Sequence, residues 1–482
     1  MQKTQKHLIV ISEDALVYED LETLKSLPEF GKIWERTALV EKVRSVYPTV
    51  TYPCHATMMT GLYPDKHGII NNEQTIMCER ASDWFHFRDA LRGPTIFDVA
   101  KAAGLSTAAV FWPVTGHRPE RGGYVKTAGG GSGAGGGFAK TAGDGSDAGR
   151  DTGAGRDTGA GDQTACSIDY LVDEYWPHDK NESSYDCFIN SGSSPEVMEK
   201  IVAPNLAYID RYHRSHPHAD HFIHACACAI IREYKPNLLM IHPANVDAYR
   251  HSSGIFSPLV THGLHEIDTW FGTIVKACED AGILDDTDFV ITSDHGQVNI
   301  TRIVSPNVIF AENGLIDVGP DGNIKDYKAF CKSSALSAQV YLKDSGDANA
   351  YGKTLSLLKQ MRDDGMYGKS DVFTADEIFE KERYKGGFSF VIETDGYTAY
   401  SNEWNRPYLR PLDKSDYRFG RATHGHLPDK GPQPTMFAFG PHIRPGIVIK
   451  QGRLVDQAPT FMRLLGLPLP QMDGAPIDEI IK

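Results

Sequence analysis

The chain has 482 residues, of which 41% are hydrophobic, and a formal net charge of −14. This length and composition allow one large α/β domain with insertions, or two domains. The acidic balance and the lack of a basic stripe exclude nucleic acid as a bulk partner, although a bound metal would still let an acidic protein hold an anion.

No stretch approaches the length of a transmembrane helix, so the sequence predicts no membrane segment. The N-terminal apolar run LIVI is short and is followed at once by acids, unlike the core of a signal peptide. We therefore expect a cytoplasmic location.

Strands and helices alternate along most of the chain. Short apolar runs predict strands at 7–12, 236–242 and 435–440, and a helix, a glycine stop and an apolar run follow one another at 94–113 and 261–296. This alternation predicts an α/β fold with a mostly parallel central sheet and helices on both faces. In such sheets ligands bind beyond the carboxyl ends of the strands, so polar groups just after strand ends are the candidates for a site.

Two regions interrupt this pattern. Residues 122–165 are rich in glycine and contain RDTGAG twice in tandem, a composition that predicts a disordered insert. Residues 325–412 hold helix-like and alternating strand-like runs, and we expect a small inserted α+β subdomain that forms one wall of the site. The main domain then comprises 1–324 and 413–482.

Thr51 lies in SVYPTVTYPCHATMMTGLYPDKHGIINN (45–72), a stretch crowded with Pro, Gly and His. A core strand would not tolerate these prolines, because Pro donates no ladder hydrogen bond. A plain surface loop would not need the run of small residues that follows. We interpret Thr51 as a nucleophile that metal ligands elsewhere in the chain activate.

Ligand-type side chains follow strand-like runs or lie in Gly-bounded turns at five places. They are Asp14; Thr51; Asp247 with His251; Asp294 with His295; and His424. Three carboxylates, three imidazoles and a hydroxyl suit two zinc ions, and two metals about 4 Å apart clamp an in-line displacement at phosphorus. Each place alone is a weak signal: an Asp after a strand is usually a cap, and Asp247 and His251, which we place in a loop, would also be explained by pairing with each other.

The stretch from Thr49 to Asn72 resembles the nucleophile segment of the nucleotide pyrophosphatase/phosphodiesterase family, within the alkaline phosphatase superfamily. ITSDHG (291–296) and THG (423–425) resemble the later metal motifs of that family. The resemblance implies that Thr51 is the nucleophile and that Asn72 donates an amide hydrogen bond to the phosphoryl oxygen. It implies two metal sites: Asp14, Asp294 and His295 with Thr51 at the metal that activates the nucleophile, and Asp247, His251 and His424 at the other.

By this resemblance we expect an alkaline-phosphatase-like fold. We also expect two divalent metal ions, for which zinc is the first choice, although manganese or iron would accept the same ligands. The expected activity is hydrolysis of a small phosphodiester or nucleotide-like pyrophosphate through a covalent phospho-threonine intermediate, so 1–324 and 413–482 would form a metal-dependent phosphodiesterase domain. The substrate is a small phosphorylated molecule. The sequence makes no prediction about oligomeric state.

Three alternatives stay open: a phosphomonoesterase, a phosphonate hydrolase, and a non-catalytic binding protein on the same fold. A phosphomonoesterase usually adds a cationic group, for which Lys66 and Arg88 are the only candidates nearby in sequence. Ile70 stands where nucleotide-cleaving relatives often carry an aromatic platform, which weakens the case for a nucleotide substrate.

Two other features receive structural interpretations. His221, His224 and Cys228 lie one helical turn apart, but no Gly-bounded turn or acid pattern accompanies them, so we interpret the segment as a partly solvated helix. Trp112 and Tyr63 lie near the site in sequence, and we assign both rings to the core.

Overall fold

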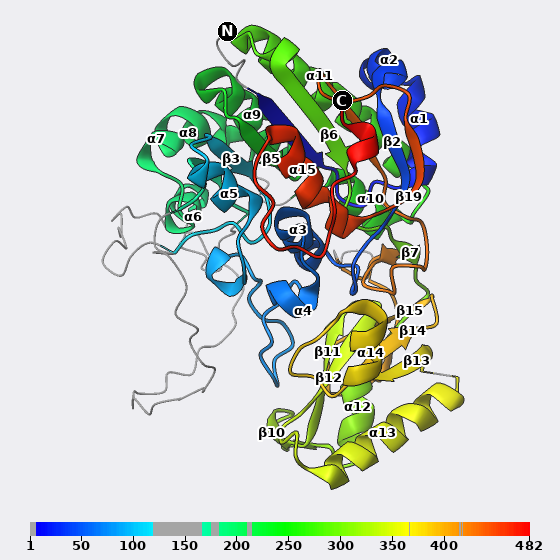
Figure 1. The fold of residues 1–482 in the computed structure, drawn as a ribbon. Helices are drawn as coiled ribbons and strands as arrows, with labels where there is room; N and C mark the ends of the chain where they lie inside the picture. Colours follow the sequence, from blue (N-terminus) through cyan, green and yellow to red (C-terminus); the bar gives the residue numbers. More distant parts are fainter. Residues whose placement is uncertain are drawn as a thin grey trace.

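An eight-stranded sheet lies at the centre of the protein, and a smaller lobe lies below it in the view of Figure 1. The computed structural model describes residues 6–118, 166–174, 183–209, 215–365, 367–413, 416 and 418–482. The glycine-rich segment 122–165, which we predicted to be a disordered insert, lies outside the described residues.

The central sheet has the strand order β19-β2-β18-β6-β1-β5-β3-β4. Its strands are β1 (His7–Ser12), β2 (Ala38–Arg44), β3 (Thr107–Val110), β4 (Tyr170–Val172), β5 (Leu238–Ile241), β6 (Thr287–Thr292), β18 (Met436–Phe439) and β19 (Val448–Arg453). Only β18 runs antiparallel to its neighbours, and every other adjacent pair is parallel. The predicted mostly parallel sheet is confirmed.

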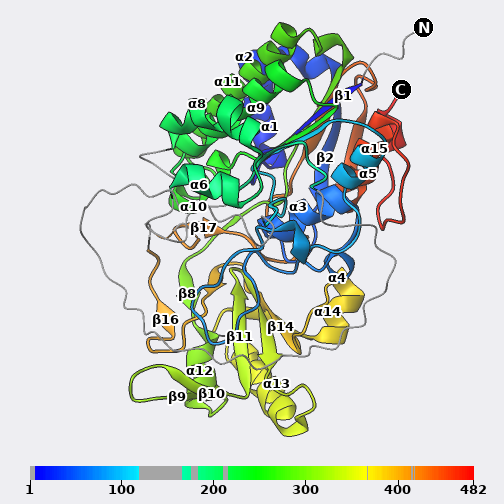
Figure 2. The same ribbon diagram turned by 90° about the vertical axis from the view of Figure 1, so that its left-hand side faces the viewer.

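Successive side chains of a strand point to opposite sides of the sheet, and in β1 the side chains on both sides are buried. In β1, Leu8 and Val10 belong to one hydrophobic cluster, whereas Ile9 and Ile11 belong to the other. Helices cover the two faces, as Figures 1 and 2 show. The first cluster packs against α3 (Thr51–Thr60), α5 (Ile96–Ala102) and α15 (Gln457–Leu465), and the second against α1 (Leu21–Ser26), α2 (Pro28–Ile33), α9 (His218–Tyr234) and α11 (Pro258–Ala281).

The predicted succession of helix, glycine and strand in 261–296 is confirmed. Helix α11 begins after Ser257, whose side chain accepts a hydrogen bond from the Val260 N–H, and it ends at Gly282 in the left-handed conformation. Only glycine adopts this conformation without strain, so the chain can turn sharply there into β6.

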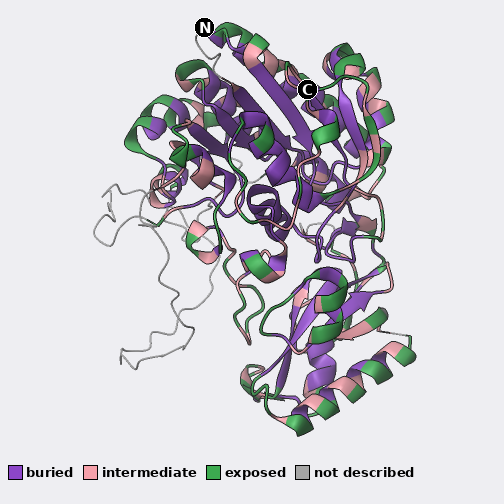
Figure 3. Cartoon of the chain, in the orientation of Figure 1, coloured by how far each residue is buried: buried purple, intermediate pink, exposed green. Residues whose placement is uncertain are grey.

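The smaller lobe contains an antiparallel sheet of order β11-β12-β14-β13. The helices and strands of this lobe include α12 (Pro306–Glu312), β9 (Ile316–Val318), β10 (Ile324–Tyr327), β11 (Ala329–Ser334), β12 (Ser337–Leu342), α13 (Ala348–Asp363), β13 (Lys369–Thr374), α14 (Ala375–Glu382) and β14 (Phe390–Thr394). Phe330, Leu358 and Ile392 form part of a separate hydrophobic cluster, and Figure 3 shows buried residues in both bodies. The boundaries of the predicted subdomain, 325–412, stay a prediction.

Among the described residues, none of the helices is both long and apolar enough to pass through a membrane. The segments after β1, β5 and β6 carry Asp14, Asp247 and Asp294. Because these three strands are neighbours and parallel, their carboxyl ends meet at one edge of the sheet.

Candidate metal centre and active site

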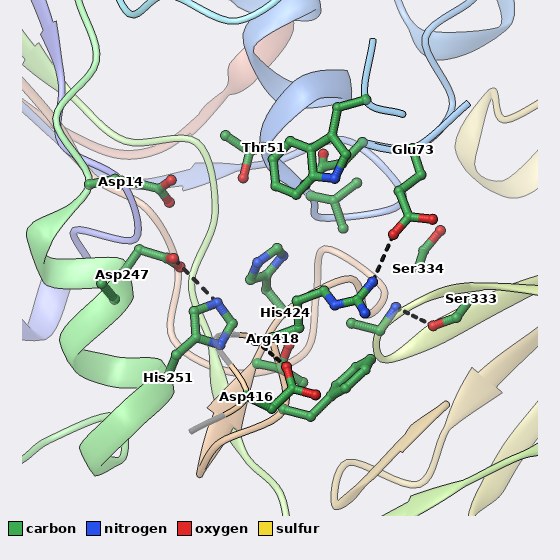
Figure 4. Close-up of a pocket in the computed structure, with 18 of the residues that line it drawn as sticks. Asp14, Thr51, Glu73, Asp247, His251, Ser333, Ser334, Asp416, Arg418 and His424 are labelled. Carbon is green, nitrogen blue, oxygen red and sulfur yellow. Dashed lines mark hydrogen bonds and ion pairs between the residues drawn. The ribbon is translucent and has the colours of Figure 1, made fainter. Parts of the chain in front are cut away.

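A cavity of about 910 Å³ lies between the carboxyl edge of the central sheet and the smaller lobe (Figure 4). Six of the predicted site residues line it: Asp14, Thr51, Asn72, Asp247, His251 and His424. Asp294 and His295 are fully buried behind this lining.

Asp14 and Asp294 lie at equivalent places on adjacent strands. Ser12 of β1 pairs with Thr292 of β6, and each carboxylate follows its strand by two residues. His295 lies between them: its Nε2 is 3.6 Å from Asp14 Oδ1 and 3.2 Å from Asp294 Oδ2. The parallel pairing of β1 and β6 thus brings together residues 280 positions apart in the chain.

Thr51 is the first residue of helix α3. Val50 precedes the helix with an extended backbone, and Pro53 is tolerated because the first turn has no intrahelical partner for its N–H. Thr51 Oγ1 lies 3.3 Å from His295 Nε2. The hydroxyl therefore stands at a helix N-terminus, where the aligned peptide dipoles favour anions.

Asp247 and His251 lie on helix α10 (Asn245–Ser253), so their predicted place in a loop is wrong. The carboxylate of Asp220 accepts hydrogen bonds from the N–H groups of Ala244 and Asn245, at 2.8 and 3.1 Å. This cap comes from another helix, so the local sequence contains no sign of it. Residues four apart on a helix face the same side, and His251 Nε2 lies 3.2 Å from Asp247 Oδ2.

Two histidines are oriented by backbone carbonyls. His251 Nδ1 lies 2.7 Å from the carbonyl oxygen of Ala422, and His424 Nδ1 lies 3.0 Å from that of Thr49. A carbonyl oxygen can only accept, so Nδ1 carries the hydrogen in each ring. Nε2 is then the nitrogen that is available to bind a metal ion.

The ligand atoms form two adjoining groups. Those of Asp247, His251 and His424 lie within 4.8 Å of one another, and so do those of Asp14, Asp247 and His295. The groups share Asp247, and the distances to His295 given above bring Thr51 and Asp294 beside the second group. The structure thus brings together all the residues that we predicted as metal ligands.

Burial, followed by repulsion from Asp247, raises the pKa of Asp14, and burial together with Asp14 raises the pKa of Asp294. Burial also opposes the charge of Asp247, but His251 and His424 hold the pKa of that carboxyl below its usual range. Asp14 Oδ1 and Asp294 Oδ2 are buried without a hydrogen-bond partner. These residues fit divalent metal ions, because a cation would offset the repulsion and zinc accepts this set of nitrogen and oxygen donors.

Asn72 lies beside the first turn of α3. Its side-chain oxygen accepts a hydrogen bond from the Tyr52 N–H at 2.8 Å, and its backbone N–H donates to Asn71 Oδ1 at 2.8 Å. The amide nitrogen lies on the other side of the same planar group. It is therefore directed away from the helix, and Asn72 lines the cavity.

Cationic and aromatic side chains that the sequence did not single out also line the cavity. Arg80, Arg410 and Arg418 lie in its wall, whereas the predicted candidates Lys66 and Arg88 form ion pairs elsewhere. The three arginines come from different segments, and no local motif marks them.

The aromatic ring of Trp84 lines the cavity, although Ile70 stands at the position where an aromatic platform was expected. Ile70 is buried in a hydrophobic cluster, and Trp84 lines the cavity, with its ring 5.2 Å from that of Tyr52. Whether the substrate carries a base therefore stays a prediction. Trp112 is fully buried, as predicted, and Tyr63 packs against the core.

The histidines of α9 have structural partners. His221 accepts a hydrogen bond from Trp270 Nε1, His224 donates to a backbone carbonyl, and Cys228 donates to another. In the described part of the chain, neither of the two metal-type groups contains them. The histidine of this region that does line the cavity is His216.

Residues 8–425 match the family model for type I phosphodiesterase / nucleotide pyrophosphatase. The chain belongs to this family. It is 35% identical over 92 residues to human ectonucleotide pyrophosphatase/phosphodiesterase family member 1, and 35% identical over 115 residues to a venom phosphodiesterase of Naja atra. These alignments cover 18% and 23% of this chain, but only 10% and 14% of the relatives' length.

Solved structures of this family share the fold over nearly the whole chain. Murine ectonucleotide pyrophosphatase/phosphodiesterase 5 superimposes with a TM-score of 0.63 at 18% identity, covering 99% of this chain and 100% of that one. The human counterpart gives the same TM-score at 17% identity. The predicted alkaline-phosphatase-like α/β fold is confirmed.

Proposed function

We propose that the protein is a zinc-dependent hydrolase that cleaves a small phosphodiester or phosphoanhydride by attack of Thr51 at phosphorus. The observation that carries this proposal is the position of the Thr51 hydroxyl, at the N-terminus of α3 and 3.3 Å from His295, beside two ligand groups that share Asp247. The family to which the chain belongs, and a solved structure of a murine member in complex with AMP, support a phosphate ester as substrate.

Two metal ions would be held by the chain's own side chains. Asp14, Asp294 and His295 with Thr51 would hold one, and Asp247, His251 and His424 the other. Zinc ions there would lower the pKa of a coordinated hydroxyl and offset the charge of the phosphoryl group.

Thr51 Oγ1 would form a bond to phosphorus while the bond to the leaving oxygen breaks, which gives a phospho-threonine and releases an alcohol or a phosphate. Water would then cleave the Thr51 Oγ1–P bond, so that phosphate monoester leaves and the hydroxyl is restored. The Asn72 amide would donate to a non-bridging oxygen, where negative charge develops.

A phosphomonoesterase is the second candidate, because arginines line the cavity where a dianionic ester would need positive charge. Activity against p-nitrophenyl phosphate, bis(p-nitrophenyl) phosphate, p-nitrophenyl thymidine 5′-monophosphate and p-nitrophenyl phenylphosphonate distinguishes the candidates. We expect the zinc-restored protein to prefer a diester, the metal-stripped protein to be inactive, and Thr51→Ala to be inactive with zinc. Preference for the monoester over every diester would overturn the proposal.

A further inference from the structure

The segment that carries Asn72 is held by the smaller lobe through the side chain of Asn71. Asn71 Oδ1 accepts a hydrogen bond from the Asn72 N–H at 2.8 Å, and Asn71 Nδ2 donates to the carbonyl oxygen of Ser333 at 3.0 Å. Ser333 belongs to strand β11 of the smaller lobe. An N–H group can only donate and a carbonyl oxygen can only accept, so the two partners fix the orientation of the Asn71 amide. One side chain thus joins the lobe to the backbone of Asn72.

This bridge between the two bodies is buried. Asn71 is 5% exposed, and its Nδ2 also lies 3.4 Å from Oε1 of Gln339, a buried residue of the neighbouring strand β12. Removal of the Asn71 amide would take a partner from the Asn72 N–H and from the Ser333 carbonyl, and polar groups that lose partners in buried surroundings are costly. The bridge therefore holds Asn72 in one position relative to β11.

Two further contacts with the lobe hold the residues on either side of Asn72. Tyr384 Oη donates a hydrogen bond to the carbonyl oxygen of Ile70 at 2.9 Å, and Tyr384 is fully buried. Lys332 Nζ donates to Glu73 Oε2 at 2.9 Å, and both side chains are buried. Because the lobe grips the chain before and after Asn72, it contributes to the position of the Asn72 amide.

The same lobe is also fixed to the metal-type residues. Leu336 lies in the turn between β11 and β12, and its N–H donates to the carbonyl oxygen of His424 at 3.0 Å. Gly425 has a φ of +97°, and a Cβ on it would lie 1.9 Å from the carbonyl oxygen of Ser334, so only glycine allows this close approach. The β11–β12 hairpin therefore contacts both His424 and the bridge to Asn72.

We propose that Asn71 and Tyr384 are positioning residues, through which the smaller lobe holds the Asn72 amide in its place beside the metal centre. This inference rests on the proposed function and goes beyond it, because it gives the lobe a part in catalysis. A donor stabilises developing charge most strongly when it is in place before the reaction. A displaced Asn72 amide should therefore lower kcat more than it weakens substrate binding.

A double-mutant cycle on the full zinc-loaded chain tests the inference, with bis(p-nitrophenyl) phosphate as substrate. Asn71→Leu removes the bridge and should lower kcat about tenfold or more, while KM changes by less than about twofold. In the Asn72→Ala background no amide is left to position, so Asn71→Leu should lower kcat by less than about twofold. Tyr384→Phe keeps the ring and removes only the hydroxyl. It should lower kcat about threefold in the wild-type background and leave it unchanged in Asn72→Ala.

Asn237→Leu is the matched control. Asn237 is buried, its Oδ1 accepts a hydrogen bond from the Ser106 N–H at 3.0 Å, and its Nδ2 donates to the carbonyl oxygen of Lys6 at 2.9 Å. It joins two backbone segments as Asn71 does, but it directly precedes β5 at the amino edge of the sheet and lies outside the cavity lining. Asn237→Leu should lower the thermal unfolding temperature and keep kcat within about twofold of the wild-type value.

Equal losses of kcat in the two backgrounds would show that Asn71 acts independently of Asn72, which would overturn the inference and leave the proposed function intact. Wild-type kcat in a folded Asn71→Leu, or in Tyr384→Phe if Asn71→Leu does not fold, would overturn it as well. A loss in Asn237→Leu as large as that in Asn71→Leu would also do so, because any buried amide would then have the same effect. If the wild-type protein cleaved no diester, the proposed function would fail and the inference with it.

Discussion

The side-chain oxygen of Asn72 accepts a hydrogen bond from the backbone N–H of Tyr52 at 2.8 Å. This bond fixes the orientation of the amide, so that its nitrogen is directed away from the Tyr52 N–H, and Asn72 lines the cavity. The donor is thereby placed before any substrate binds, which is the condition under which a hydrogen bond stabilises developing charge most strongly.

Asn72→Ala should lower kcat for a diester about 100-fold, because the non-bridging oxygen loses a preorganised donor. Steady-state kinetics of the zinc-loaded protein measure this. Asn313→Ala, in the smaller lobe and outside the cavity lining, is the control and should keep wild-type kinetics. A change in KM alone would show that Asn72 binds the substrate and the transition state equally, which would contradict a role confined to the developing charge.

Thr51→Ala should lower kcat about 10⁴-fold, because no other hydroxyl is predicted to attack phosphorus. Thr51→Ser keeps a hydroxyl on the same helix turn and should retain activity within about tenfold. Mass spectrometry of protein acid-quenched during turnover of p-nitrophenyl thymidine 5′-monophosphate should find a thymidylyl group on residue 51 of the wild type. A thymidylyl group on any other residue, or turnover by Thr51→Ala, would be incompatible with the mechanism.

Gln297 supports the shared ligand: its Nε2 donates to the backbone oxygen of Asp247 at 3.1 Å and also to the carboxylate. Gln297→Met keeps the volume but removes the amide, and should weaken zinc binding about tenfold, since such supporting bonds hold the ligand in place. Competition with a chromophoric chelator measures this without reference to activity. Gln457→Met is the control, because Gln457 is equally buried but bonds to Thr292. If Gln297→Met bound zinc as tightly as Gln457→Met, Gln297 would have no role in positioning Asp247.

Glu393 links stability to pH. It is fully buried between the two bodies, with Tyr47 Oη at 3.1 Å and Lys430 Nζ at 3.1 Å, and burial raises its pKa to about 7. The folded state holds the proton more tightly than the unfolded chain, where Glu titrates near 4.3. The stabilisation is therefore complete below about pH 4 and is lost as pH rises through about 7.

The free energy of unfolding should thus fall by about 3 kcal/mol from this group between pH 4 and pH 8. Glu393→Gln should remove this component, and denaturant unfolding at several pH values measures it. Glu312→Gln, an exposed substitution, should leave the pH dependence unchanged. A pH dependence of Glu393→Gln as steep as that of the wild type would contradict the assignment.

Some parts of the fold could be predicted from short stretches of sequence, because their hydrogen bonds and turns involve residues that are close in the chain. The apolar run 7–12 and the succession from α11 through Gly282 to β6 carry their signals in consecutive residues. Asp14 and Asp294 were predictable for a related reason: each follows a strand of the central sheet by two residues, and parallel strands bring their carboxyl ends to one edge.

The rest depends on contacts between distant segments. Helix α10 was missed because its N-terminal cap is Asp220, 25 residues before Asn245. The pair of Arg418 and Glu73 in the cavity lining was missed because the two residues meet across 345 positions, and neither lies in a recognisable motif. Such pairings appear only when the fold brings the segments together.

We propose that the gathered side chains hold two metal ions, one of them through Asp247, His251 and His424. The most direct test is the zinc content per chain, measured by inductively coupled plasma mass spectrometry after stripping, reloading and removal of excess metal. We predict two zinc ions per wild-type chain and at most one in Asp247→Asn. One ion or fewer in the folded wild type, or two in Asp247→Asn, would contradict a two-metal centre that depends on Asp247.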